Sequence, residues 1–511
     1  MGLCTWCGRL SFGWVVVLAG ITIHISLGIL YSQGNMAPYI VSYTRERSLD
    51  LHREIVTLSV SPWLYGSATI VQGLSLALGG WLVKVIGTRP TALIGSLTLT
   101  GGVFLTAGSV MLSFWAVVMT FGVLMGLGMG ITYVAPLHAA VQWLPKYRGV
   151  VIGLIVAGLG LSSFMFIPIQ TVFINPKNLI PNHTPDEQIG FSYFTQPELL
   201  DRVPYSFIVL GGILLVIQLI SIPFIVEPHE THPNAPTAPV TSWPCLRYLW
   251  ATLRPTLPTS FSRHREKSNS EGSPEVRAGE SHELLDQSAN DSGASGDEMP
   301  REESAPKQEK SQPNVKPKEL LLRWDFYLLW VAFAGVGEAV VYIVSVYKIF
   351  GQEFIFDDHS LAVVGAVAAV ANCIGRFTWG IIADQVSYTT VLAIIAGGIA
   401  ALTFTLYGTS VGKLPIYIIW IGLLFFWFGG VFSAFPTAVA SRYGTEHFAA
   451  NYGLFFTAQM FASVVAILIS TLTHHYIRWF GQMIFAGSVS FVALILVIVV
   501  SCAKFGKKTT D

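Results

Sequence analysis

An arginine inside an otherwise apolar segment is the residue with the clearest chemical potential in this chain. Arg376 lies within Leu361–Ala383, a stretch hydrophobic enough to cross a bilayer. A charged side chain near mid-bilayer costs several kcal/mol unless it faces a wet cavity or a partner, so such residues mark paths for anions or protons. We expect Arg376 to bind a carboxylate. A cytoplasmic gate, or a permanent pair with an acid, is the alternative.

A polar residue lies one helical turn before this arginine. Asn372 and Arg376 are four residues apart, so they share one face of a helix. The planar guanidinium matches a carboxylate through two parallel hydrogen bonds, and a neighbouring amide can hold the ligand or orient the guanidinium. The pair therefore predicts an anion-binding site.

Two titratable residues are candidates for proton coupling. Glu338 lies near the middle of the apolar segment Phe326–Phe350. A buried carboxyl group tends to keep its proton, and an adjacent arginine opposes that tendency. We hypothesise that Glu338 carries a proton and pairs with Arg376 when no substrate is bound; a static pair is the alternative. His24 can titrate near neutral pH, although a neutral histidine bonded to a neighbouring helix explains it as well.

Polar residues also follow one face of the first apolar segment, where His24, Gly28, Tyr31 and Asn35 recur at helical spacing. We expect Tyr31 to donate a hydrogen bond to the substrate. Two aromatic residues are predicted walls of the same site, with ordinary helix packing as the alternative for each: Tyr133 and Trp427.

The composition indicates that these residues are embedded in a membrane. Hydrophobic residues make up 52% of the 511 residues and charged residues only 12%. A transmembrane helix needs about 20 mostly apolar residues. We expect an all-α membrane protein with twelve such helices, at Trp14–Val41, Ile55–Leu82, Thr91–Met111, Ser113–Leu137, Val150–Phe173, Tyr205–Val226, Phe326–Phe350, Leu361–Ala383, Thr390–Tyr407, Pro415–Ala438, Ala449–Thr473 and Gly481–Cys502.

The predicted helices fall into two halves, residues 1–226 and 323–511, joined by a linker at 227–322. The linker has too few apolar residues to offset the entropy of ordering, so we expect it to be mostly disordered and able to dock cytoplasmic partners. The halves also repeat. Gly130–Pro136 corresponds to Gly430–Pro436, 300 positions later, and parallel six-helix repeats are typical of secondary transporters.

An even number of helices places both termini and the linker on one side. The basic residues that flank or lie in the linker favour the cytoplasm for that side: Arg247, Arg254, Arg263 and Arg323. Asn182-His-Thr184 lies in an opposite loop and matches a glycosylation acceptor. We expect a eukaryotic plasma-membrane protein, with an endosomal or lysosomal membrane, suggested by Glu283-Leu-Leu285, as the alternative.

Several function classes lack their characteristic residues. The sequence has no GxxxxGK[ST] loop, so ATP-driven pumping is not expected. Cys4-Thr-Trp-Cys7 is a weak indication of metal, because palmitoylation or no modification explains it better. We expect no metal and no cofactor. No nucleophile triad is evident, so we expect no enzyme, and a net charge of zero gives no indication of nucleic-acid binding.

Several stretches together resemble the major facilitator superfamily over nearly all of the chain except the linker. They are Gly126–Leu137, Gln142–Gly149, Asn372–Gly380 and Asn451–Gln459. Within that superfamily the chain looks most like the oxalate:formate antiporter branch and, more distantly, the monocarboxylate transporters. The resemblance implies the major facilitator fold, in which two pseudo-symmetric halves of six helices rock about a central site.

One departure from that branch bears on the substrate. Members that exchange dicarboxylates carry a Lys in a Tyr-Thr-Ala-Lys pattern, where this chain has Phe456-Thr-Ala-Gln459. The resemblance places Gln459 in the site. A single buried cation leaves a second carboxylate unpaired and costly to desolvate. The departure favours a monocarboxylate such as lactate, pyruvate or formate over oxalate.

The resemblance also implies gate residues in the cytoplasmic loops. Lys84 stands where the family usually has an Asp, although Arg89 remains, and the second copy of the loop keeps its acid as Asp384. A contact between an acid and a helix end is therefore in doubt in the first half and expected in the second. A solvated charge is the alternative for Lys84, and Arg148 is the remaining gate candidate.

These observations predict a secondary transporter that moves a small organic anion across a lipid bilayer by alternating access. Proton symport and anion exchange both fit the residues. A dicarboxylate exchanger and a non-transporting nutrient sensor on a transporter scaffold are the competing functions.

Overall fold

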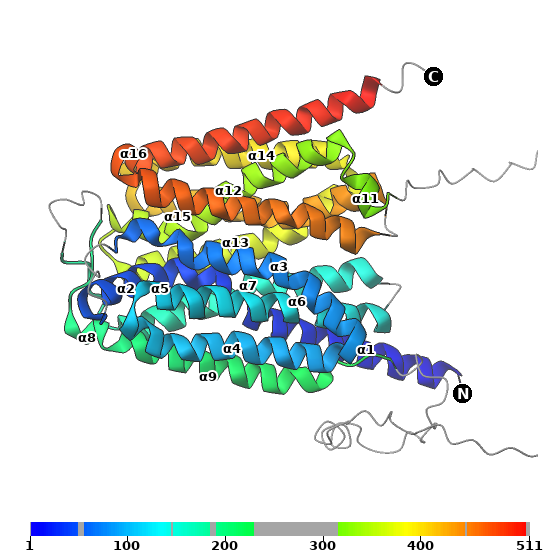
Figure 1. Ribbon diagram of the computed structural model, residues 1–511, viewed down its shortest axis with the longest axis horizontal. Helices are drawn as coiled ribbons and strands as arrows, with labels where there is room; N and C mark the ends of the chain where they lie inside the picture. The colour runs from blue at the N-terminus through cyan, green and yellow to red at the C-terminus, as the bar shows by residue number, and fades with distance from the viewer. Residues whose placement is uncertain are drawn as a thin grey trace, which may run out of the picture. The chain divides into compact units, whose positions relative to one another are not determined.

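The computed structural model describes residues 2–49, 56–144, 147–183, 191–228, 315–444 and 447–506. These residues belong to one compact unit, and they are almost wholly helical (Figure 1). Within the described ranges the one β-type pairing is an isolated bridge between His183 and Tyr193. Most of the predicted linker lies outside the described residues, so its disorder and its partners stay predictions.

The N-terminal half, residues 2–228, contains six crossings of a membrane-sized length. Several of them are built from more than one helical piece: α1 (Gly2–Leu27), η1 (Gly28–Ser32) and α2 (Gln33–Arg47); η3 (Leu58–Val60) and α3 (Pro62–Ile86); α4 (Thr88–Leu112); α5 (Phe114–Val117), η4 (Val118–Leu124) and α6 (Met125–Trp143); α7 (Arg148–Ile174); and α8 (Pro197–Leu200), α9 (Arg202–Ser221) and η6 (Ile222–Phe224).

The C-terminal half, residues 315–506, repeats this arrangement with longer continuous helices. It comprises α11 (Pro317–Leu320), α12 (Trp324–Gln352), α13 (Asp358–Gln385), α14 (Tyr388–Leu406), α15 (Thr409–Tyr443) and α16 (Phe448–Gly506).

The last helix accounts for two crossings. Eleven described segments are long and apolar enough to span a membrane, and the last of them, Ala450–Cys502, has 53 residues. A straight helix of that length would measure about 80 Å, far more than a bilayer. The chain reverses at Arg478, whose φ of 47° interrupts the helix. With this break the chain has twelve crossings, which confirms the predicted fold class.

Both ends of the chain lie on one face of the bundle. α1 begins and α16 ends at this face, here called the terminal face, and α8 lies at the opposite face, here called the loop face (Figure 1). The halves meet where α7 packs along α13, α3 along α16, and α2 along α12. At Gly34 a Cβ would lie 2.0 Å from the carbonyl oxygen of Val344, so only glycine permits the approach of α2 to α12.

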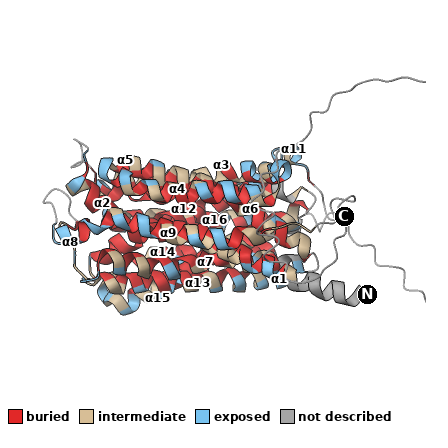
Figure 2. Cartoon of the chain, turned by 90° about the horizontal axis from the view of Figure 1, so that it is seen from below, coloured by how far each residue is buried: buried red, intermediate tan, exposed pale blue. Residues whose placement is uncertain are grey.

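The burial pattern agrees with a membrane-embedded bundle. Buried residues fill the interior, while exposed apolar residues lie along the outer helices (Figure 2). In α12 the most apolar window is 89% buried, so this helix is surrounded by protein on nearly every side. Polar groups of α12 must therefore find partners inside the bundle.

Candidate anion-binding site

The site forms around Arg376, which lies on α13 and is 6% exposed. Its Nε donates to Oδ1 of Asn372 at 3.0 Å, and its Nη2 donates to the hydroxyl of Tyr31 at 3.0 Å. Asn372 donates from Nδ2 to the carbonyl oxygen of Phe425 at 3.0 Å, which turns its amide oxygen toward the guanidinium. Because Tyr31 belongs to the N-terminal half, the two halves share the site.

Aromatic rings surround the guanidinium. Its Cζ lies 4.9 Å from the ring centre of Phe432 and 5.7 Å from that of Tyr31, and the faces of such rings attract cations. Both rings are partly exposed and the Arg376–Tyr31 bond is only part-buried, so water reaches the edge of the site. Three further tyrosines interact electrostatically with Arg376: Tyr65, Tyr133 and Tyr452.

Among the described side chains, no acid neutralises Arg376. Its partners are an amide oxygen, a hydroxyl and two rings. A buried guanidinium without a counter-ion is costly, and a carboxylate offers the geometry that would offset this cost. The arrangement is therefore suited to hold one small anion.

The structure brings together four of the residues predicted for the site. Arg376, Asn372 and Tyr31 form a hydrogen-bonded set, and Tyr133 is close enough to interact electrostatically with both Arg376 and Tyr31. His24 joins this group through its ring, whose centre lies 5.1 Å from that of Tyr133 in an edge-on arrangement.

Gln459 lies apart from these contacts. It is fully buried on α16, against Gly337 of α12, where a Cβ would lie 2.5 Å from the Gln459 Oε1. Neither its amide oxygen nor its nitrogen has a hydrogen-bond partner in the described part of the chain. Its contact with a substrate stays a prediction.

Trp427 is placed in helix packing instead of beside Arg376. Its ring covers Gly398 of α14, where a Cβ would lie 2.8 Å from the indole, and its centre lies 4.7 Å from that of Trp379. The glycine leaves room for the bicyclic ring, so α14 and α15 approach closely within the C-terminal half. These are packing contacts, and a part for the ring in a wall of the Arg376 site stays a prediction.

Glu338 faces a different neighbour from the one predicted. On α12, Glu338 lies three residues after Gly335 and four residues before Tyr342. Gly335 packs against the final segment of α16, and Tyr342 donates to Gln482 of that segment at 2.7 Å. This spacing turns Glu338 toward the same segment. It is 2% exposed, and its Oε2 has no hydrogen-bond partner among the described residues. The predicted pair with Arg376 is not among its described contacts.

The predicted gate residues take separate places. Lys84 is exposed at the end of α3, as a solvated charge would be. Arg89 donates from Nη2 to the carbonyl oxygen of Pro223 at 2.9 Å, a bond within the N-terminal half. The side chains of Arg148 and Asp384 lie outside the described set, and their gate roles stay predictions.

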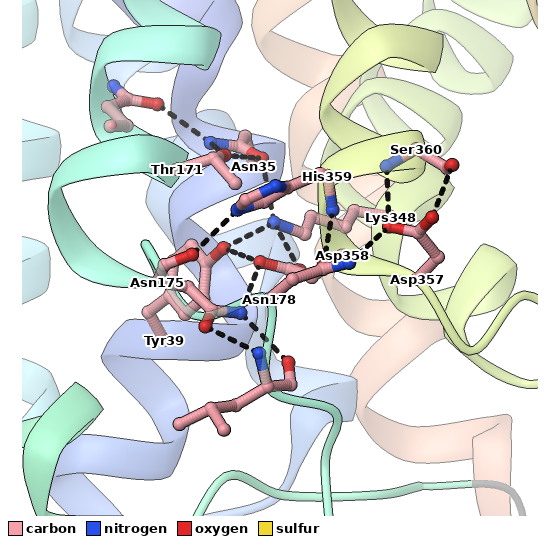
Figure 3. Close-up of polar contacts among 12 residues, drawn as sticks. Asn35, Tyr39, Thr171, Asn175, Asn178, Lys348, Asp357, Asp358, His359 and Ser360 are labelled. Carbon is pink, nitrogen blue, oxygen red and sulfur yellow. Dashed lines mark hydrogen bonds and ion pairs between the residues drawn. The ribbon is translucent and has the colours of Figure 1, made fainter.

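A second buried cation, Lys348, lies near the loop face (Figure 3). Its Nζ is 2.8 Å from Oδ1 of Asp358, and it donates to Oδ1 of Asn35 at 2.9 Å and to the hydroxyl of Tyr39 at 2.8 Å. Oδ2 of Asp358 accepts from Tyr39 and, at 2.9 Å, from Asn175. Both charges belong to the C-terminal half, and the neutral partners belong to the N-terminal half.

A second set of bonds joins the halves beside this ion pair (Figure 3). Asn178 donates to Oδ1 of Asp357 at 2.9 Å and accepts from the backbone N–H of His359 at 3.0 Å, while His359 Nε2 donates to the Asn175 carbonyl at 2.7 Å. Asp357 also caps α13. The backbone N–H of Ser360, followed by other donors, lowers the pKa of Asp357, so the cap is ionised at neutral pH.

Sequence reasoning missed the Lys348–Asp358 pair. Both residues lie at the ends of apolar segments, where charges are ordinarily solvated, and nothing local shows that they meet. One signal was available, because Lys348 falls inside the predicted helix Phe326–Phe350 and Asn35 ends the polar stripe. These bonds show the halves in contact at the loop face, and the Arg376–Tyr31 bond joins the halves nearer the centre of the bundle.

We predict that Tyr39→Phe shifts the conformational equilibrium toward an open loop face. The change removes one hydroxyl that both accepts from Lys348 and donates to Asp358. A hydrogen bond to a charged group contributes about 1.5–3 kcal/mol, so the open population should rise at least about tenfold. Labelling of Val344→Cys, one helical turn before Lys348 on the face of α12 that meets Gly34 of α2, by a membrane-impermeant thiol reagent measures this population in an otherwise cysteine-free background.

Tyr43→Phe is the matched control, because Tyr43 lies one turn further along α2 and is also buried. Its electrostatic neighbours are Arg47 and Asp201, and it is not part of the Lys348 network. Its labelling should equal that of the parent. Equal labelling of the Tyr39→Phe variant would show that the network does not hold the loop face closed.

Comparisons with known proteins agree with the geometry. The family model described as Major Facilitator Superfamily matches residues 1–467. Apicoplast pyruvate carrier 1 of Toxoplasma gondii is 27% identical over 90% of this chain and 82% of that protein. The oxalate:formate antiporter of Oxalobacter formigenes is 20% identical over 86% of this chain and 82% of that protein.

A solved structure supports the same fold. A D-xylose-proton symporter superposes with a TM-score of 0.61 at 11% identity, covering 94% of this chain and 97% of that one. The family match spans nearly the whole chain, and the twelve crossings in two halves follow the same plan. The chain belongs to the Major Facilitator Superfamily.

Proposed function

We propose that this protein is a secondary transporter of small monocarboxylates that works by alternating access. The observation that carries the proposal is the buried Arg376, whose described partners are all neutral. A carboxylate bound there would replace the water that the anion loses and supply the missing counter-charge.

The count of buried charges favours one carboxylate over two. Lys348 is the other cation buried near the interface of the halves, and Asp358 already neutralises it. Arg376 is therefore the one described cation of this interface left for a ligand. A dicarboxylate would bring a second negative charge without a partner, which is costly in a low-dielectric site. Lactate, pyruvate and formate fit this limit.

The names of the relatives support small carboxylates as the substrates. One is named as a pyruvate carrier and another exchanges oxalate for formate, according to their names. Arg376 bonds to Tyr31 across the halves, so a bound anion would contact both. This suits a site that opens alternately to the two faces. Transport would be coupled to protons or to a second anion.

We also propose that the terminal face is cytoplasmic and that the protein resides in a eukaryotic plasma membrane. Asn182 is exposed in the segment between α7 and α8 on the opposite face, where an acceptor must lie to be glycosylated.

Arg376→Ala should lower the initial uptake of labelled pyruvate and lactate at least about 100-fold, because two charge-assisted hydrogen bonds of about 1.5–3 kcal/mol each are lost. Arg376→Lys keeps the charge but loses the planar guanidinium that donates two parallel hydrogen bonds, so the initial uptake should fall about tenfold or more. Arg202→Ala, an exposed arginine of α9, is the control. Uptake by Arg376→Ala at the control level, with equal amounts in the membrane, would disprove the assignment.

Gln459→Lys should extend binding toward dicarboxylates. The substitution places a second cation among the buried residues beside α12, which could compensate a second carboxylate. Competition between labelled pyruvate and unlabelled oxalate measures the change, with oxalate expected to compete at least several-fold better in the variant. Gln459→Met, equally long but uncharged, is the control. No gain for oxalate would place position 459 outside the substrate's reach.

Asn182→Gln should abolish the glycosidase-sensitive shift in electrophoretic mobility of the protein made in eukaryotic cells. A second triplet of the same acceptor pattern, Asn290-Asp-Ser292, belongs to the linker. Asn290→Gln is therefore the matched control and should leave the mobility shift unchanged. A shift that depends on Asn290 would reverse the proposed orientation.

A further inference from the structure

His24 presents a bare acceptor nitrogen inside the bundle. It lies on α1, two helical turns before Tyr31, and is fully buried. Its Nδ1 lies 3.0 Å from the carbonyl oxygen of Gly20. A carbonyl only accepts, so Nδ1 carries the hydrogen, and in the neutral ring Nε2 carries a lone pair. That Nε2 is buried without a hydrogen-bond partner among the described residues.

Among the described residues, the surroundings of His24 are neutral except for one group. Tyr133 of α6 meets its ring edge-on, and Gly158 of α7 lies beside its Cβ. From α9, the neighbours of α1 are uncharged: Ser221, bonded to Thr22, and Gln218, bonded to Ser26. Across the interface of the halves, His24 interacts electrostatically with Arg376 of α13.

This arrangement makes proton and anion binding depend on one another. His24 and Arg376 interact electrostatically, and a unit charge about 10 Å from a partly buried group changes the proton affinity of that group by roughly tenfold. Without a ligand, the charge of Arg376 opposes a second positive charge on the imidazole. A carboxylate on Arg376 cancels that charge and removes the opposition. By reciprocity, a protonated His24 strengthens anion binding by the same factor.

Glu338 lacks this relationship with the site. Its stripe on α12 faces the final segment of α16, and its interactions do not include Arg376. Of the two described residues predicted for proton coupling, only His24 interacts electrostatically with Arg376, the residue proposed to bind the substrate carboxylate.

We propose that Nε2 of His24 is the proton-binding site of the transporter and that it is coupled to the carboxylate on Arg376 through charge alone. This inference rests on the proposed function. The proton adds to the Nε2 lone pair, neutral imidazole becomes imidazolium, and no bond to the substrate forms. The empty site then holds one positive charge on Arg376. The loaded site holds two positive charges and one negative, so the net charge is unchanged.

The test uses full-length protein in proteoliposomes with labelled pyruvate. His24→Asn keeps an N–H that can donate to the Gly20 carbonyl but cannot take up a proton. With one pH unit across the membrane, the parent should accumulate pyruvate up to about tenfold, the limit for one proton per anion. The variant should only equilibrate it, and its pyruvate counterflow should need about tenfold more pyruvate to reach half of its maximum, because the strengthening of anion binding by the proton is lost. His138→Asn, at an exposed histidine of α6, should behave as the parent.

Accumulation of pyruvate by His24→Asn equal to that of the parent would overturn the inference. So would a result in which Glu338→Gln loses accumulation and His24→Asn keeps it. A second measurement needs no variant: binding of pyruvate to the purified parent in weak buffer should take up protons, at most about half a proton per anion for a tenfold change in proton affinity, and no uptake at any pH would overturn the inference even if His24→Asn fails to fold. The proposed function fails separately, if the parent moves no monocarboxylate or if Arg376→Ala transports normally.

Discussion

A positive charge held inside a low-dielectric bundle by neutral groups is the constraint on which the rest of the structure depends. Arg376 cannot be solvated by lipid, so the chain surrounds it with an amide, a hydroxyl and two aromatic rings. Asn372 is in turn oriented by the Phe425 carbonyl. Among the described residues this centre lacks a counter-charge, which the proposed carboxylate would supply.

Much of the architecture follows from the sequence because the membrane imposes simple length and polarity rules. A bilayer demands runs of about 20 apolar residues, and such runs are visible without a structure. The Asn372–Arg376 contact was equally visible, since residues four apart on a helix must adjoin. The bond from Arg376 to Tyr31 was expected only in outline, as two polar stripes on helices that line one pathway.

The features that the sequence did not reveal depend on which helices become neighbours. Periodicity places Glu338 and Trp427 on a face of their helices, but it does not say what that face meets. Gly398 admits the Trp427 ring, and Tyr342 with Gln482 turns the Glu338 face toward the last helix. The Lys348–Asp358 pair was hidden for the same reason, because its members lie on separate helices and each reads alone as an ordinary terminal charge.

The placement of both charges of the loop-face ion pair in one half has an energetic consequence. Lys348 and Asp358 both travel with the C-terminal half, whereas Asn35, Tyr39 and Asn175 travel with the other. Separating the halves therefore replaces the hydrogen bonds that these neutral side chains make to the two ions with hydrogen bonds to water, and it leaves the Lys348–Asp358 pair together. The barrier to this motion contains no charge-separation term, so added salt should leave its height almost unchanged.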